Sequence, residues 1–325
     1  MVLVLLVAGL GVLLISGTLL VDGAANLATR LRVSPIVLGL TLVAFGTSLP
    51  ELAVNVSASS SGNTALSLGN IFGSNIANLG LVLGSALLVR SLAVESLVMR
   101  REIPLLLLTS AVAVVLASDG WLRGTALQID RADGLILLLL FLIFVYVNLS
   151  DILTQRSDDP LLRQAAEIPA RMRGSRDYLY IGLGILGLPL GASLVVDNAT
   201  VIALQLGVSQ AVIGLSLVAV GTSVPELVTS VIAAIRHQGS LAVGNVVGSN
   251  LINTLLILPI SAQLAVLPIE PGAAIDIWVS LLFTIALCVL ALVTRLRLNR
   301  LHGVILLVAY FGYIGWRFIS AVAVE

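Results

Sequence analysis

Long hydrophobic stretches alternate with short polar segments along the sequence. A membrane-spanning helix needs about 20 mostly apolar residues. Ten stretches fit this description: 2–22, 34–60, 64–89, 103–118, 132–149, 178–205, 209–235, 240–267, 274–294 and 302–320. The first has no positively charged start and no small-residue cleavage site, so we interpret it as a span and not as a signal peptide. The pattern predicts an all-α membrane protein with ten transmembrane helices.

The arginines predict how these helices are oriented, because short cytoplasmic loops are enriched in basic residues. All 17 basic residues are arginines. If the N-terminus lies outside, all but three of them fall in inside loops; the exceptions are Arg123, Arg131 and Arg317. The tryptophans fall near the outer face, as in an interfacial aromatic belt, and are Trp121, Trp278 and Trp316. Both termini are therefore predicted to lie outside.

Composition supports a membrane protein and excludes several other classes. The chain is 58% hydrophobic and 10% charged, with a mean hydropathy of +1.12, whereas a soluble protein is about 25% charged. Its 17 basic and 17 acidic residues balance, so no basic surface is offered to nucleic acid. The single cysteine, Cys288, lies in an apolar run and excludes an intramolecular disulfide and a cysteine-based zinc cluster.

An internal repeat gives the strongest signal in the sequence. A shift of 175 residues aligns GLTLVAFGTSLPE (Gly39–Glu51) with GLSLVAVGTSVPE (Gly214–Glu226), ten of thirteen positions being identical. The same shift aligns GNIFGSNIAN (Gly69–Asn78) with GNVVGSNLIN (Gly244–Asn253). Each half contains five predicted spans, and an odd number forces the second half into the bilayer with the opposite orientation. Inverted repeats of this kind are typical of transporters, whose substrate site lies at the midplane between the halves.

The repeat divides one integral membrane domain into three parts. Residues 1–150 form the first five-helix repeat, 151–177 a polar cytoplasmic linker and 178–325 the second five-helix repeat. The linker is too short for a regulatory domain, although one short surface helix would fit in it.

The repeated TSLPE and TSVPE motifs predict a broken helix in each half. Proline inside a helix removes one backbone hydrogen bond, so Pro50 should release the carbonyl of Gly46, and Pro225 that of Gly221. Within a bilayer such carbonyls are tolerated only where they line a cavity or contact protein. We therefore expect both breaks to face a polar site.

Glu51 and Glu226 are the principal candidate ligands of that site. A charged side chain at the bilayer centre costs about 2.5–3.5 kcal/mol, and two converging carboxylates would repel each other without a cation between them. Carboxylates, carbonyls, hydroxyls and amides are the hard oxygen ligands that Ca²⁺ prefers, and Na⁺ accepts the same donors. Neither His237 nor His302 is near the motifs, so a soft transition-metal site is not expected.

The third and eighth spans each place polar residues on one helix face, four residues apart. These residues are Asn70, Ser74 and Asn78 in the third span and Asn245, Ser249 and Asn253 in the eighth. The pairs Gly69/Gly73 and Gly244/Gly248 have the small-xxx-small spacing that lets helices approach closely. We expect the polar faces to reach the broken helices.

Structural roles compete with ion binding at each of these positions. The glutamates could be protonated and hydrogen-bonded between helices, and Ser74, Ser249, Asn78 and Asn253 could hold helices together. For Asn70, Asn75, Asn245 and Asn250, packing or capping weighs at least as much as ligation. Asp22 and Asp197, also related by 175 residues, could line an ion pathway, but solvation of helix ends is the favoured interpretation.

With GTSLPE and GNIFGSNIAN in one half and GTSVPE and GNVVGSNLIN in the other, the chain resembles the cation/calcium exchanger superfamily. It is most similar to the short prokaryotic sodium/calcium exchangers over essentially its whole length. The resemblance implies that Glu51 and Glu226 coordinate Ca²⁺ and share in Na⁺ binding. It further implies Na⁺ ligation by the hydroxyls of Ser48, Ser74, Ser223 and Ser249, backbone carbonyl ligands at Ala44, Thr47, Ala219 and Thr222, and an amide at Asn78 beside the central site.

Asn253 departs from part of that superfamily. Prokaryotic and potassium-dependent relatives often have aspartate there, whereas this chain and the potassium-independent animal exchangers have asparagine. The substitution removes one possible negative charge, argues against a potassium requirement and leaves the ion stoichiometry open. The proton-coupled branch usually carries a glutamate in a GNxxE-type motif, which is absent here, so proton coupling is the alternative function.

The function expected from these features is secondary antiport, in which Na⁺ entry drives Ca²⁺ out through alternating access to one midplane site. An intramembrane enzyme using Glu51 and Glu226 as an acid/base pair lacks a nucleophile with an adjacent base and a phosphate-binding loop. A channel is a third class, against which the doubled broken helix argues weakly. We expect Ca²⁺, Na⁺ and the lipid of a prokaryotic inner membrane as partners, with no cofactor, no nucleic acid and no obligatory protein partner.

Overall fold

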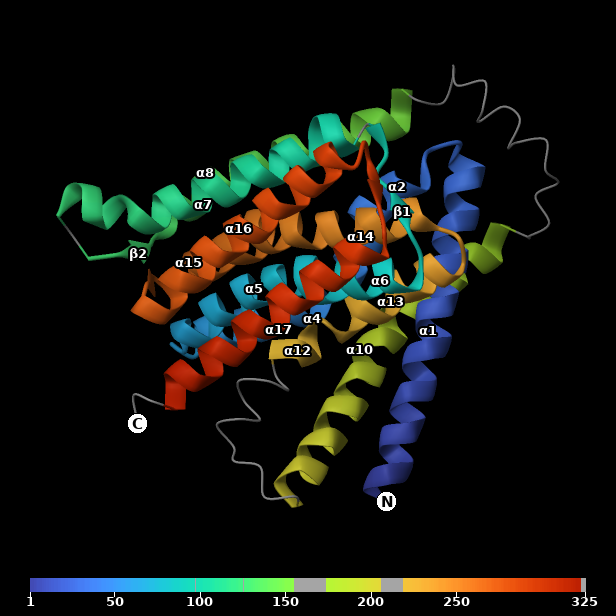
Figure 1. Ribbon diagram of the computed structural model, residues 1–325, viewed down its shortest axis with the longest axis horizontal. Helices are drawn as coiled ribbons and strands as arrows, with labels where there is room; N and C mark the ends of the chain where they lie inside the picture. Colours follow the sequence, from blue (N-terminus) through green and yellow to red (C-terminus); the bar gives the residue numbers. More distant parts are fainter. Residues whose placement is uncertain (97, 125, 155–173, 206–218, 323–325) are drawn as a thin grey trace.

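The computed structural model describes residues 1–96, 98–124, 126–154, 174–205 and 219–322, which form a bundle of long helices (Figure 1). The first half contains α1 (Val2–Leu31), α2 (Pro35–Leu38), η1 (Gly39–Val43), α3 (Ala44–Thr47), α4 (Leu49–Ser60), α5 (Thr64–Ala77), η2 (Asn78–Val82), α6 (Leu83–Val89), β1 (Leu92–Ala93), η3 (Val98–Glu102), α7 (Ile103–Arg123), β2 (Gln128–Ile129) and α8 (Arg131–Thr154). The second half contains α10 (Gly174–Gln205), α12 (Ala219–Thr222), α13 (Val224–Ile235), α14 (Gly239–Ile252), η5 (Asn253–Ile257), α15 (Leu258–Leu264), β3 (Leu267–Pro268), α16 (Pro271–Val293), β4 (Arg297–Leu298) and α17 (Arg300–Val322). The segments η1, η2, η3 and η5 are π-helical turns.

The all-helical, multi-span fold predicted from the hydrophobic pattern is confirmed. Within the described ranges, eight helices are long and apolar enough to cross a membrane, or nine if the bent pair Pro35–Thr47 and Leu49–Ser60 counts as one span. The expected span at 209–235 begins in residues outside those ranges. Its described part consists of α12 and α13.

Two helices are longer than the hydrophobic runs that predicted them. Helix α1 continues to Leu31 instead of ending near residue 22, and α10 begins at Gly174. Asp22 therefore lies inside a helix, so its predicted place near a helix end is wrong, whereas Asp197 lies in α10 within the stretch 178–205 that predicted that helix. Alanine, leucine and arginine after Asp22 favour helix without being continuously apolar. The edges of the expected linker at 151–177 are also helical, and its central residues 155–173 lie outside the described chain.

The elements that follow each break have the same bounds when shifted by 175 residues. This holds for α4 and α13, α5 and α14, η2 and η5, and α6 and α15. The short strands β1 and β3 follow the same spacing. The sequence repeat is thus accompanied by the same local conformation, including a π-helical turn at the same place.

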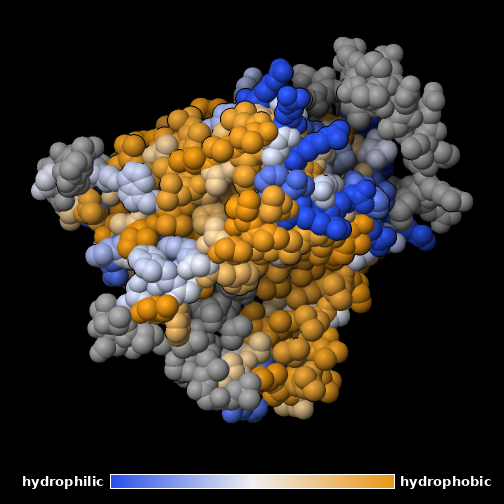
Figure 2. All heavy atoms as spheres, in the orientation of Figure 1, coloured by the Kyte–Doolittle hydropathy of each residue, from blue (hydrophilic) through white to orange (hydrophobic). Residues whose placement is uncertain are grey.

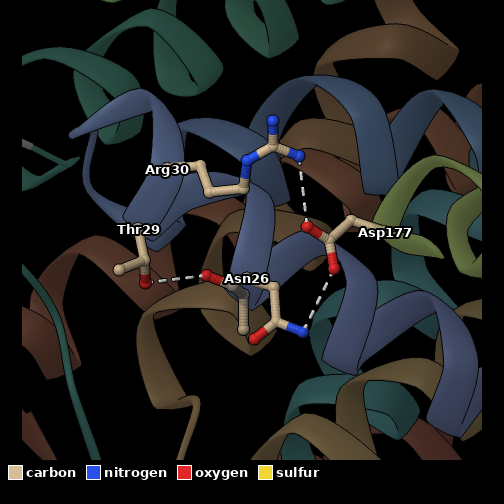
Figure 3. Close-up of polar contacts among 5 residues, drawn as sticks. Asn26, Thr29, Arg30 and Asp177 are labelled. Carbon is tan, nitrogen blue, oxygen red and sulfur yellow. Dashed lines mark hydrogen bonds and ion pairs between the residues drawn. The ribbon is translucent and has the colours of Figure 1, made fainter. Parts of the chain in front are cut away.

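Helices α1 and α10 run side by side and cross the direction of the other long helices (Figure 1). A Cβ atom at Gly184 would lie 2.9 Å from the backbone oxygen of Ser16, so only glycine permits this approach. At one end of the pair, the buried carboxylate of Asp177 lies between Arg30 and Asn26 (Figure 3). Arg30 Nη1 donates to it at 3.3 Å and Asn26 Nδ2 at 3.4 Å. The polar contact fixes the two helices to each other at this end.

The spans that carry the repeated asparagine motifs form the centre of the bundle, where most of their residues are buried. A Cβ atom at Gly244 would lie 2.7 Å from the backbone oxygen of Ile36, and one at Gly248 would lie 2.5 Å from that of Leu40. The close approach predicted for this glycine pair is confirmed. Gly69 and Gly73 have no described atom within 4 Å of a built Cβ. The positions 175 residues beyond Ile36 and Leu40 fall in 206–218, outside the described residues.

Two short antiparallel ribbons connect the halves. Strand β1 pairs with β4, and β2 pairs with β3. The strands β1 and β2 lie at opposite ends of the bundle (Figure 1). Each ribbon therefore joins a connection of the first half to a connection of the second.

Most of the visible surface is hydrophobic, as expected of a surface that contacts lipid (Figure 2). Hydrophilic residues gather at the end of the bundle that carries β1 (Figure 2). Arg90, Arg297 and Arg300 are exposed near this ribbon. Trp278 and Trp316 are about half exposed, whereas the side chain of Trp121 lies outside the described part of the chain.

Candidate ion-binding site

The first broken helix places Glu51 at the start of a helical segment. The break falls at Ser48, whose φ of −86° and ψ of 7° separate α3 from α4, and the axes on either side differ by 45°. Pro50 therefore occupies the first turn of α4, where its missing N–H costs no helical hydrogen bond. The break was expected at the proline and lies two residues before it. Because Glu51 is in the first turn of α4, the helix dipole favours its negative charge.

The second half repeats this local structure. Ser223, with φ −85° and ψ 3°, separates α12 from α13, and Glu226 lies in the first turn of α13. Both glutamates are almost completely buried, at 1% and 0% exposure. Ser48, which lies at the break just before Glu51, donates to Glu226 Oε1 at 3.0 Å. The fold thus brings together the two carboxylates that the sequence singled out.

Glu226 is hydrogen-bonded by serines from two other helices. The Ser48 hydroxyl lies 3.0 Å from Glu226 Oε1 and 3.1 Å from the Ser249 hydroxyl. The Ser249 hydroxyl lies 3.5 Å from the same carboxylate oxygen. Ser48 comes from the broken helix of the first half, so Glu226 belongs to a site shared by both halves.

The corresponding groups around Glu51 are arranged differently. Among the described residues, neither Glu51 carboxylate oxygen has a hydrogen-bond partner, and the same is true of the Ser223 hydroxyl and of Glu226 Oε2. Ser74, the counterpart of Ser249, lies 3.5 Å from the Thr222 hydroxyl. These buried oxygen atoms can accept a cation as a ligand without giving up a hydrogen bond.

The asparagines that begin the polar faces make hydrogen bonds to the threonines of the opposite broken helices. Asn70 Nδ2 donates to Thr222 Oγ1 at 3.2 Å, and Thr47 Oγ1 donates to Asn245 Oδ1, also at 3.2 Å. Each pair joins the third or eighth span to the other half. The prediction that the polar faces reach the broken helices is confirmed.

Two polar residues beside these asparagines were not identified from the sequence. Asn55 Nδ2 donates to Asn70 Oδ1 and to the Glu51 backbone oxygen, both at 2.7 Å. In the second half, Asn245 Nδ2 donates to Ser230 Oγ at 3.0 Å. Asn55 and Ser230 lie four residues after the glutamates, on the same helix face, and this spacing was the available signal.

Asn78 and Asn253 each lie where an α-helix changes into a π-helical turn. Such turns often occur at functional sites because the wider turn changes the direction of the side chains. Asn253 Nδ2 donates to Asn75 Oδ1 at 3.1 Å, and its own Oδ1 is buried without a described partner. Both side-chain polar atoms of Asn78 are buried without a described partner.

The carbonyl ligands implied by the resemblance are described only in part. The Ala44 carbonyl accepts hydrogen bonds from the Ser48 backbone nitrogen at 3.0 Å and from Thr47 Oγ1 at 3.3 Å. It would have to exchange a hydrogen bond to bind an ion. Ala219 lies in the backbone of α12, but its side chain lies outside the described residues. Ion ligation by Ala44, Thr47, Ala219 and Thr222 stays a prediction.

The buried donor set consists of carboxylate, hydroxyl and amide oxygens, which suit Ca²⁺ or Na⁺. Among the described residues, no group of three or more His, Cys, Asp or Glu side chains comes together. The two carboxylates would balance the charge of one divalent cation. The arrangement can therefore bind a hard cation between the halves of the protein.

Asp22 and Asp197 lie apart from these residues in different environments. Asp22 forms an ion pair with Arg236, with Oδ2 and Nη2 3.5 Å apart and both side chains about half exposed. Asp197 is exposed and accepts a hydrogen bond from Ser193 at 3.0 Å.

Comparison with known proteins shows similarity along nearly the whole chain. A sequence profile of the family described as sodium/calcium exchanger protein matches residues 1–150 and 177–319. Inner membrane protein YrbG of Escherichia coli is 35% identical over 83% of this chain and 82% of its own length. Sodium/calcium exchanger MaX1 of Methanosarcina acetivorans is 31% identical over 95% of this chain and 96% of its own length.

Solved structures of the sodium–calcium exchanger NCX_Mj have the same fold. One, from crystals soaked with Na⁺ and Ca²⁺, superposes with a TM-score of 0.82 at 30% sequence identity, covering 97% of both chains. Another, soaked with Na⁺ and Sr²⁺, has the same TM-score and identity and covers 97% of this chain and 99% of its own.

Proposed function

Because the chain belongs to the sodium/calcium exchanger family, and is thus an integral membrane ion antiporter and not an enzyme, we propose that it exchanges Na⁺ for Ca²⁺. The observation that carries the proposal is the pair of buried glutamates, one from each half, surrounded by hydroxyl and amide oxygens. MaX1 and NCX_Mj, which are named sodium/calcium exchangers, provide independent support.

The charge of the site explains how the two ions are coupled. Glu51 and Glu226 can neutralise one Ca²⁺, or they can help to hold several Na⁺, but they cannot satisfy both at once. Ser48, Ser74, Ser223 and Ser249 supply hydroxyls, and Asn78 and Asn253 supply amide oxygens, for the remaining coordination. Competition for one set of ligands makes the binding of one ion depend on the release of the other.

Alternating access to this site follows if the halves are inverted repeats. Matching element bounds at a spacing of 175 residues support a repeat. The two ribbons at opposite ends of the bundle are arranged as two antiparallel halves require. We place the arginine-rich end with β1 in the cytoplasm, both termini outside and ten spans in total. A prokaryotic inner membrane is the proposed location, as the name of YrbG indicates for that relative.

The direct test is ion exchange by the purified protein in vesicles. Proteoliposomes loaded with Na⁺ should take up ⁴⁵Ca²⁺ when they are diluted into Na⁺-free buffer, and uptake should stop when external Na⁺ matches internal Na⁺. Uptake that ignores the Na⁺ gradient but follows a pH gradient would favour the proton-coupled alternative. Unitary currents far above carrier rates would instead indicate a channel.

A further inference from the structure

Where the third and eighth spans cross, Asn75 makes a set of hydrogen bonds that its counterpart in the second half does not make. Asn75 of α5 lies at the centre of these hydrogen bonds and is 2% exposed. Its side-chain oxygen accepts a hydrogen bond from Asn253 Nδ2 at 3.1 Å, and its side-chain nitrogen donates to Thr254 Oγ1 at 3.1 Å. Its backbone oxygen accepts from Asn250 Nδ2, also at 3.1 Å. All three partners belong to the second half.

The positions related by 175 residues lack this arrangement. Asn250, the counterpart of Asn75, donates to a backbone oxygen and makes no described side-chain hydrogen bond with Asn78. Leu79 occupies the position that corresponds to Thr254. The described chain therefore holds the amide of Asn253 in place and leaves the amide of Asn78 without such a partner.

The orientation of the Asn253 amide matters because its two ends have opposite chemistry. The oxygen can ligate a cation, whereas the NH₂ group would repel one. The terminal torsion of asparagine is broad and roughly two-fold, so packing alone discriminates weakly between the two orientations. In this structure Asn75 binds the NH₂ end, and the oxygen end is buried without another described partner.

Asn253 lies on the helix face that carries the site. Asn253 follows Ser249 by four residues, which places both on one face. Ser249 lies 3.1 Å from the Ser48 hydroxyl and 3.5 Å from Glu226 Oε1. The π-helical turn that begins at Asn253 also packs against α4, the helix whose first turn contains Glu51.

We propose that Asn75, anchored by Thr254, is a positioning residue that fixes the Asn253 amide with its oxygen toward the ion site. The proposal rests on the function given above and assigns a role to a residue that does not itself touch the ion. It makes the two halves of the site unequal, because the second-half amide is preorganised and the first-half amide at Asn78 is not. Preorganisation lowers the cost of ordering the ligand when Ca²⁺ binds.

The first test measures the concentration dependence of Ca²⁺ exchange by Asn75→Ala and, in parallel, ⁴⁵Ca²⁺ binding in detergent. The loss of one buried hydrogen bond predicts a rise in KM and in Kd of about 3- to 10-fold, with kcat nearly unchanged. Asn250→Ala is the matched control, since it removes a hydrogen bond from the same crossing and leaves the Asn253 amide held. It should lose stability but keep the wild-type KM.

A double-mutant cycle separates positioning from general packing. If Asn75 acts through Asn253, then Asn75→Ala should not weaken Ca²⁺ binding further in an Asn253→Ala background. Equal weakening in both backgrounds would overturn the proposal, and so would an unchanged KM in a monodisperse Asn75→Ala protein.

A second pair of variants covers the case in which Asn75→Ala does not fold. Thr254→Val removes the anchor of Asn75 and should raise the KM about 2- to 5-fold, whereas Thr254→Ser keeps the hydroxyl and should behave as wild type. A Thr254→Val protein with the wild-type KM would overturn the proposal. Wild-type protein that binds no Ca²⁺ would overturn the proposed function and this inference together, whereas wild-type binding that these variants leave unaltered would overturn this inference alone.

Discussion

Replacement of one site glutamate by glutamine tests the central charge argument most directly. Glu51→Gln and Glu226→Gln keep the size of the side chain and one oxygen donor while removing one of the two charges that neutralise a divalent ion. Both side chains are almost completely buried, so solvent cannot replace the lost charge. Each variant should bind Ca²⁺ much more weakly and should not exchange it.

The size of the loss follows from the depth of the site. One uncompensated charge at the bilayer centre costs about 2.5–3.5 kcal/mol on insertion scales. At about 1.4 kcal/mol for each factor of ten, the affinity for Ca²⁺ should fall roughly 60- to 300-fold. A loss of this size would remove measurable exchange at Ca²⁺ concentrations near the wild-type KM.

The two variants should differ in stability when no ion is present. Glu51 has no described hydrogen-bond partner at either carboxylate oxygen, so Glu51→Gln should raise the Tm in Na⁺-free and Ca²⁺-free detergent. Glu226 is hydrogen-bonded by Ser48 and lies close to Ser249. Hydrogen bonds to a charged group contribute about 1.5–3 kcal/mol, so Glu226→Gln should raise the Tm by less.

The assay combines ⁴⁵Ca²⁺ uptake into Na⁺-loaded proteoliposomes, Ca²⁺ binding in detergent and thermal unfolding of each purified variant. Glu95→Gln is a matched control, because Glu95 accepts hydrogen bonds from Ser34 at 2.9 and 3.0 Å and is not part of the site. It should exchange Ca²⁺ as wild type. If both site variants were monodisperse and bound Ca²⁺ with near wild-type affinity, the site would be in the wrong place and the charge argument would fail.

Two further predictions concern acids outside the site. Asp22→Asn and Asp197→Asn should keep most of the exchange activity, since one aspartate pairs with Arg236 near the surface and the other is exposed; vesicle uptake that is abolished in either variant would place that residue in the ion pathway. Arg30→Gln should lower the stability of the protein by about 1.5–3 kcal/mol, because it leaves the buried Asp177 carboxylate with weaker partners. Thermal unfolding measures this effect, and an unchanged Tm would show that the contact between Arg30 and Asp177 contributes nothing to stability.

Much of the site could be predicted because its motifs occur twice in the sequence. Glu51 and Glu226 stand at equal positions in two nearly identical motifs, and the four-residue spacing of Ser74 and Ser249 from neighbouring asparagines defines a helix face. The hydrophobic pattern likewise predicted the helical, multi-span fold. These features depend on local spacing, which a sequence shows directly.

Features that depend on contacts between distant residues could not be predicted. The π-helical turns at Asn78 and Asn253 add no recognisable residue pattern to the motif. The repeat predicts equal hydrogen bonding in both halves, but Ser48 contacts Glu226 while the Ser223 hydroxyl has no described partner. The contact between Asn75 and Thr254 joins residues 179 positions apart, and nothing near either one marks it.

Each ribbon can form only after its second strand has been synthesised, because it pairs a strand of the first half with one of the second. Leu92 of β1 pairs with Leu298 of β4, roughly 200 residues later in the chain. At about 5–20 residues per second, some 10–40 s separate the appearance of the two strands. During the part of that interval before α13 and α14 are made, the first half must persist in the bilayer with Glu51 and the polar face of its third span uncovered by the second half. The first half must therefore remain inserted with polar residues exposed until the helices of the second half bury them.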